Sequence, residues 1–153
     1  MARTSARVGK HPIHPMLVVL PLGLWIAALA FDIVHAVTHG PIWRTLAFWN
    51  IAAGIIGALL AAVPGFVDYL DLQGRARRIA TFHMVLNLGA VALFAVNWYI
   101  RTRVAPDSWW PLALSVIGVV GIGISGWLGG ELVYAERVGV EEPPRNERYR
   151  RVA

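Results

Sequence analysis

The sequence contains no cysteine, and this absence removes several kinds of chemistry at once. Disulfide bonds, iron–sulfur clusters and thiol catalysis all need the cysteine sulfur, so none of them can be built within this chain. The sequence also has no GxSxG, P-loop or zincin motif. A hydrolase is therefore the least favoured class of function.

Charged residues are scarce as well. They make up 15% of the 153 residues, whereas soluble domains carry roughly 25%. Hydrophobic residues make up 57% of the chain, and the mean hydropathy is +0.56. A soluble fold of this size could not bury so much apolar surface, so lipid must cover part of it. The net charge of +5 does not point to nucleic acid, because the basic residues lie mainly between apolar runs.

Four runs of the sequence lack Asp, Glu, Lys and Arg altogether, namely 11–31, 45–67, 79–100 and 108–130. Each run has about the 20 residues that a helix needs to cross the hydrocarbon. Trp and Tyr gather at the run ends, as is typical of membrane-interface aromatics. The first run follows three basic residues, but its length and its two His-Pro pairs favour a retained helix over a signal peptide.

The pattern predicts an all-α integral membrane four-helix bundle in up-down-up-down order, because short joints separate the runs and no sequence repeat occurs. We expect a transmembrane domain over 1–137 and a basic, disordered cytoplasmic tail over 138–153. The predicted helices cover about 13–37, 43–68, 78–101 and 109–134. Eleven of the 14 Lys and Arg residues fall on the side of the two termini. The positive-inside rule therefore places both termini in the cytoplasm.

Polar residues inside membrane spans are costly, and they are candidates for function. Four such clusters fall at the predicted cytoplasmic helix ends: 11–15, 64–69, His83 with Asn87, and 126–134. Sequence-distant polar groups at one depth suggest one shared site.

His14 and His83 are the strongest candidates within that site. A helix start disfavours extra positive charge, which keeps the His14 ring neutral, as metal ligation requires. Two neutral histidines on different helices can hold a haem iron from both sides. We therefore predict one haem b ligated by His14 and His83, with Asn87, Tyr134 and Gly129 around it. The second and fourth runs contain no histidine, so a second bis-histidine haem is excluded.

Other interpretations of the same residues remain open. Gly118, Gly121, Ser125 and Gly129 form a small-residue ridge that would admit a flat macrocycle, but such ridges also serve helix packing. An alternative divalent-metal site would use His14 and His83 with His11, Asp68 and Glu131, because zinc accepts mixed His and carboxylate ligands. The polar cluster could also simply hold the bundle together. On the other side, Asp32, His35 and His39 could form an ion pair, a proton port or a metal site, and the sequence does not choose among them.

These motifs resemble the bacterial membrane family catalogued as domain of unknown function 2231. The resemblance rests on His11-Pro12-Ile13-His14-Pro15, on His83 with Asn87, and on the segment from Gly126 to Leu132, and it covers about 10–140. It implies a four-helix protein of the bacterial inner membrane. It also implies a redox context, since some relatives are fused to Rieske iron–sulfur domains. Relatives often carry His-Gly where this chain has Glu136-Arg137, so no histidine role is carried over there.

Two classes of function follow. In the first, the chain is an electron-transfer protein that exchanges electrons with quinone, a Rieske-type protein or another redox protein. In the second, it is a non-redox accessory or divalent-metal-binding membrane protein. Transport is poorly supported, because four helices without inverted repeats leave little room for a pathway unless a homo-oligomer supplies it.

Overall fold

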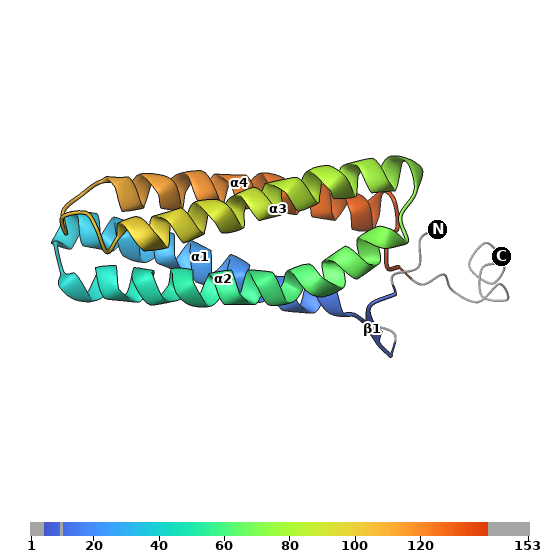
Figure 1. Cartoon of the computed structure of the whole chain (residues 1–153), viewed down its shortest axis with the longest axis horizontal. Coiled ribbons are helices and arrows are strands. Elements are labelled where there is room, and N and C mark those ends of the chain that lie inside the picture. Colours follow the sequence, from blue (N-terminus) through green and yellow to red (C-terminus); the bar gives the residue numbers. More distant parts are fainter. Residues whose placement is uncertain (1–4, 10, 141–153) are drawn as a thin grey trace, which may run out of the picture.

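The fold is a bundle of four antiparallel helices, as the sequence predicts (Figure 1). The computed structural model describes residues 5–9 and 11–140. The helices are α1 (Ile13–Thr38), α2 (Pro41–Leu70), α3 (Gly74–Ile100) and α4 (Trp110–Tyr134). A short hairpin of β1 (Arg7–Val8) and β2 (His11–Pro12) precedes them. The expected tail over 141–153 lies outside the described residues.

Each helix is long and apolar enough to cross a membrane, with 25 to 30 residues and a hydropathy of 1.9 to 2.4 over its most apolar window. Only 17% to 28% of each such window is buried within the protein. Most apolar side chains therefore point outward, where hydrocarbon rather than water is the favourable surrounding. The described chain is a membrane-type bundle with a thin core.

Proline sets the beginning of three helices, since its missing N–H does no harm in a first turn. Pro12 caps α1, Pro41 begins α2, and Pro111 lies in the first turn of α4. The expected and observed helix ends differ most at α3, which begins at Gly74 rather than at 78. Arg75 and Arg77, which we expected in the loop between the second and third helices, belong instead to an additional first turn of α3.

The helices contact one another in the order α1–α2–α3–α4 and back to α1, so α1 and α3 lie diagonally across the bundle. The start of α1 and the end of α4 lie at the same end of the bundle (Figure 1). Below we call this the histidine end, because it contains His14 and His83, and we call the other the arginine end, because it contains Arg44 and Arg101.

Two aromatic rings fill the centre of the core. Trp25 on α1 and Phe94 on α3 stack with ring centroids 4.2 Å apart and an interplanar angle of 16°. Each ring presses on a glycine of a neighbouring helix, Trp25 on Gly54 of α2 and Phe94 on Gly118 of α4. Gly118, the first member of the predicted small-residue ridge, therefore serves ring packing at this depth.

We predict that Gly54→Ala destabilises the bundle. A Cβ at position 54 would lie 2.3 Å from Trp25 Nε1, and Trp25 cannot retreat because it is buried against Phe94. Overpacking of this kind costs about 1–3 kcal/mol, which thermal unfolding of the detergent-purified protein would show as a lower Tm. Gly123→Ala is the matched control, since a Cβ there meets nothing within 4 Å. Equal Tm values for the two variants would contradict the packing role of Gly54.

Candidate functional site

His14 and His83 meet across the interior of the bundle at the histidine end. His14 is the second residue of α1, and His83 lies in the third turn of α3. Their ring centroids are 6.3 Å apart, and the rings are nearly perpendicular, at 89°. The two imidazoles that the sequence singled out thus come from diagonally opposed helices and lie side by side.

Each imidazole is anchored to the backbone of a neighbouring helix. His14 Nδ1 lies 2.8 Å from the carbonyl oxygen of Ala61 on α2, and His83 Nδ1 lies 2.8 Å from that of Ser125 on α4. A carbonyl oxygen only accepts hydrogen bonds, so both Nδ1 atoms donate. In a neutral ring, Nε2 then carries the free lone pair, as in many histidines that bind metals.

The surroundings of the two rings differ. Asn87 lies one turn beyond His83 on α3, and its side-chain Nδ2 is 3.0 Å from His83 Nε2. The Ser125 hydroxyl lies 3.0 Å from His83 Nδ1. Among the described residues, His14 Nε2 has no such hydrogen-bond partner. Both ring nitrogens of His83 therefore have hydrogen-bond partners, whereas Nε2 of His14 has none among the described residues.

Two glycines make room for the rings. A Cβ on Gly65 of α2 would lie 2.7 Å from His14 Nδ1, and a Cβ on Gly129 of α4 would lie 3.3 Å from His83 Cε1. Gly129, which we predicted to lie against a cofactor, thus lies against one of the predicted ligands. The close approach of backbone to imidazole at Gly65 requires glycine there.

The other predicted site residues have partners or positions of their own. Asp68 is buried, and its Oδ1 accepts a hydrogen bond of 2.9 Å from the backbone N–H of Ala6. Glu131 forms an ion pair with Arg75 at 2.7 Å. His11 is exposed in strand β2, and the Tyr134 side chain is 86% exposed. In the part of the chain that the structure describes, no group of three or more His, Asp or Glu side chains could hold a metal ion.

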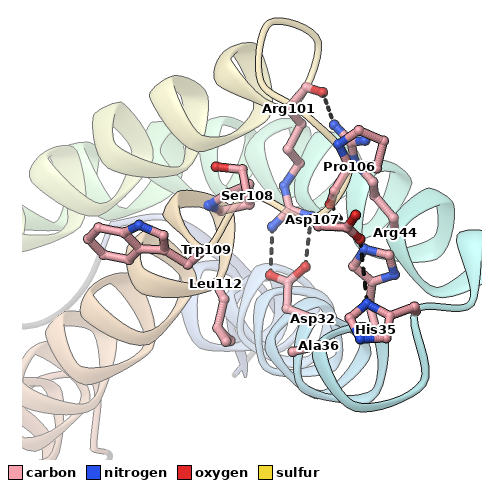
Figure 2. A pocket seen from close by; sticks show the side chains of 12 residues that line it. Asp32, His35, Ala36, Arg44, Arg101, Pro106, Asp107, Ser108, Trp109 and Leu112 are labelled. Carbon is pink, nitrogen blue, oxygen red and sulfur yellow. Dashed lines mark hydrogen bonds and ion pairs between the residues drawn. The ribbon is translucent and has the colours of Figure 1, made fainter.

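A second polar cluster lies at the arginine end, and it centres on a buried ion pair. Arg101 at the end of α3 binds Asp32 of α1 through two hydrogen bonds of 2.7 and 2.6 Å, as Figure 2 shows. Ser115 of α4 donates to the same carboxylate at 2.6 Å, and Asn97 accepts from Arg101 Nε at 3.1 Å. The Asp32 and Arg101 side chains are 5% and 2% exposed, so these contacts replace their hydration.

Sequence reasoning missed Arg101. We considered His35 as the partner of Asp32, whereas the carboxylate binds the arginine of another helix. One signal was available: Asp32 ends the first charge-free run, and Arg101 directly follows the third, on the same predicted side of the membrane. The spacing shows that the two charges share a depth, but not that their helices turn them toward each other.

A pocket of about 130 Å³ opens beside this ion pair (Figure 2). Its walls combine the pair with ionisable and aromatic side chains from α1, α2 and the loop between α3 and α4, including His35, Arg44, Asp107 and Trp109. Arg44 donates to the carbonyl oxygens of Arg101 and Val104. His39 Nδ1 lies 3.4 Å from Asp107 Oδ1, and both side chains are exposed. The charged groups of the pocket thus all have polar neighbours.

The comparisons with known proteins point to one family. Residues 10–142 match the model of a family described as "Predicted membrane protein (DUF2231)". No curated protein and no solved structure matches the chain. The matched range contains both polar clusters and all four helices.

We predict that Asp32→Ala strongly destabilises the protein, because it leaves Arg101 buried without its counter-charge. Removal of one partner from a buried pair costs about 3–5 kcal/mol, which unfolding in detergent would measure. Asp107→Ala is the matched control, since the Asp107 side chain is 74% exposed and its pairing with His39 is solvated. We expect no resolvable change there. If both variants unfolded alike, the Asp32–Arg101 pair would not hold the helices together.

Proposed function

We propose that this chain, which belongs to the DUF2231 family of predicted membrane proteins, is an electron-transfer protein that carries one b-type haem between His14 and His83. One observation carries the proposal: two imidazoles from diagonal helices lie 6.3 Å apart, each held through Nδ1 by a backbone carbonyl. A histidine pair inside apolar helices is costly, and it calls for a role beyond helix packing.

The separation of the rings supports shared ligation of one iron. If haem were bound, His14 and His83 would hold its iron, because their ring centroids lie only 6.3 Å apart. The Nδ1 hydrogen bonds fix the ring orientation and raise the basicity of Nε2. The Asn87 amide, which lies at His83 Nε2, would have to turn away from that atom. When bound, haem would supply one-electron redox chemistry, and the apolar bundle would tune its potential.

The number of histidines limits the proposal to one such group. The chain has five histidines, and neither α2 nor α4 contains any. His35 and His39 lie at the arginine end, 21 and 25 residues after His14 along α1 and its C-cap. The rise of the helix separates His14 from His35 by about 32 Å. His35 and His39 both belong to α1 and its C-cap, and no other helix has a histidine at that end, so a second pair on two different helices cannot form.

We further propose that the histidine end faces the cytoplasm of a bacterium, in its inner membrane. The excess of arginine and lysine at this end supports that orientation. The redox partner would then be quinone, which reaches the site through the lipid, or a Rieske-type or other redox protein. The short distance between the histidines and the helix ends supports a partner at the membrane surface.

A second candidate function is a non-redox accessory protein, in which the histidines only join helices. The observation in its favour is that His83 is fully hydrogen-bonded by Ser125 and Asn87 without any cofactor. A divalent-metal version needs His11, Asp68 and Glu131 to leave their present positions, since Asp68 binds Ala6 and Glu131 binds Arg75.

The visible absorption spectrum of protein purified from haem-replete cells tests the proposal. We expect a reduced b-type band from the natural sequence, and haem content at background level from His14→Ala and His83→Ala, because each removes one axial ligand. His39→Ala should keep the band, since this ring is 71% exposed at the arginine end. A folded natural protein without the band would disprove haem binding, and metal without porphyrin in elemental analysis would favour the accessory function.

A glycine variant tests the geometry while both imidazoles stay in place. Gly65→Ala would push the His14 ring off the Ala61 carbonyl, because the new Cβ would lie 2.7 Å from Nδ1. We expect haem content to fall about tenfold at limiting haem, as when a ligand loses its orienting hydrogen bond. Gly126→Ala is the control, since a Cβ there meets nothing within 4 Å. Unchanged haem affinity in Gly65→Ala would show that the hydrogen bond from His14 to the Ala61 carbonyl is not needed for haem binding.

A further inference from the structure

The pocket at the arginine end is too small to enclose a whole cofactor. Its volume is about 130 Å³, whereas pockets that enclose ligands of drug size usually measure about 300–1,000 Å³. It is nevertheless much larger than the space that a single water needs. A pocket of this size suits a small polar group whose remainder lies outside the protein.

Arg44 brings to this pocket a positive charge that no carboxylate neutralises in the part of the chain that the structure describes. Its Nη2 donates to the backbone carbonyl oxygens of Arg101 and Val104, which leaves the N–H groups of Nε and Nη1 to donate. No buried side-chain nitrogen or oxygen of the described residues lacks a partner, so Nε and Nη1 are open to a molecule in the pocket.

Asp107 brings the opposite charge to the same pocket. Its side chain is 74% exposed, and within the described ranges its one ionisable neighbour is His39, with Nδ1 at 3.4 Å. The other two charged residues of the pocket, Asp32 and Arg101, neutralise each other. The pocket therefore presents one available cation, Arg44, and one available anion, Asp107.

Apolar side chains form the rest of the wall. Figure 2 shows Trp109 and Leu112 on one side of the buried ion pair, with Arg44 and Asp107 on the other. Trp109 stacks on Trp110 with ring centroids 4.0 Å apart, and the two side chains are 62% and 52% exposed. Exposed tryptophans at the end of a membrane-spanning helix are typical of the headgroup layer. The pocket thus lies where lipid headgroups meet the acyl chains.

We propose that this pocket binds the headgroup of a zwitterionic phospholipid. The phosphodiester accepts hydrogen bonds from Arg44, because a guanidinium is well matched to phosphate oxygens. The ammonium group of the same headgroup donates to Asp107. Charge complementarity selects the zwitterion, because an anionic headgroup would offer no cation to Asp107. The acyl chains then follow Trp109 and Leu112 into the bilayer.

The inference is independent of haem, because it concerns the opposite end of the bundle. In the orientation proposed above, the lipid belongs to the outer leaflet. Its binding would join α1 and α2 to the loop between α3 and α4, since the pocket is lined by residues of all three segments.

Native mass spectrometry of the detergent-purified full chain tests the choice of headgroup. The protein is mixed with equal amounts of dioleoyl phosphatidylethanolamine and dioleoyl phosphatidylglycerol, which share the phosphodiester, although only the first has an ammonium group. We expect the protein to retain about threefold more phosphatidylethanolamine, as exposed ion pairs contribute little each. Equal retention of the two lipids, or a preference for phosphatidylglycerol, would overturn the proposal.

Two variants remove one charge each. Arg44→Gln should retain about tenfold less of both lipids, because it loses a charge-assisted hydrogen bond to the phosphate. Asp107→Asn should retain the two lipids equally, because it loses the contact with the ammonium group. Arg103→Gln is the matched control, since Arg103 belongs to the same loop but lies over the Tyr99 ring and does not line the pocket.

Unchanged lipid retention in a folded Arg44→Gln protein, or an equal loss in Arg103→Gln, would overturn the assignment to this pocket. Circular dichroism of the helices reports folding in each case. If Arg44→Gln does not fold, Asp107→Asn still decides, because its side chain is exposed. An Asp107→Asn protein that keeps the preference of the natural sequence would contradict the proposal.

A competition experiment separates the lipid from its free headgroup. Soluble glycerophosphoethanolamine carries the same two charges without acyl chains. We expect it to displace no phosphatidylethanolamine at about tenfold excess, because burial of the acyl chains against apolar side chains stabilises only the lipid. Displacement at that excess would assign the pocket to a water-soluble zwitterion and overturn the lipid as its occupant.

Discussion

A polar group inside a lipid-facing bundle must find its partner within the bundle, because hydrocarbon offers none and each unpaired group costs several kcal/mol. The core of this protein is thin, since most of each apolar span faces outward, so few positions can shelter a polar side chain at all. Among the described residues, no buried side-chain nitrogen or oxygen lacks a hydrogen-bond partner. The polar groups are consequently gathered into two layers, one at each end.

An apolar layer separates those two polar layers. The stacked rings of Trp25 and Phe94 cross the bundle at its centre, and glycines on α2 and α4 allow the helices to approach them. The same pattern recurs at the histidine end, where Gly65 and Gly129 lie against the imidazoles. At these four contacts the rings come from α1 and α3, and the glycines come from α2 and α4.

The two polar layers differ in what they leave available. At the arginine end, Asp32, Arg101, Ser115 and Asn97 satisfy one another almost completely, which suits a fixed joint between α1, α3 and α4. At the histidine end, His14 has one ring nitrogen without a partner among the described residues. The ring nitrogen without a partner thus lies at the histidine end, whereas the pocket of about 130 Å³ lies at the arginine end.

The sequence alone determined that lipid surrounds the protein, how many helices it has and in which order they follow. Charge-free runs of about 20 residues can be stable in lipid only as membrane-spanning helices. It also predicted that His14, His83, Asp68 and Glu131 lie at one end of the bundle, since the depth of a residue follows from its position along the helix. It did not determine which side chains would meet. The partner of Asp32, the position of Tyr134 outside the bundle and the pairing of Glu131 with Arg75 depend on how each helix is rotated about its axis. Helical periodicity is weak here because lipid accepts apolar residues on every face, so only tertiary packing, through the fit of rings against glycines, decided those rotations.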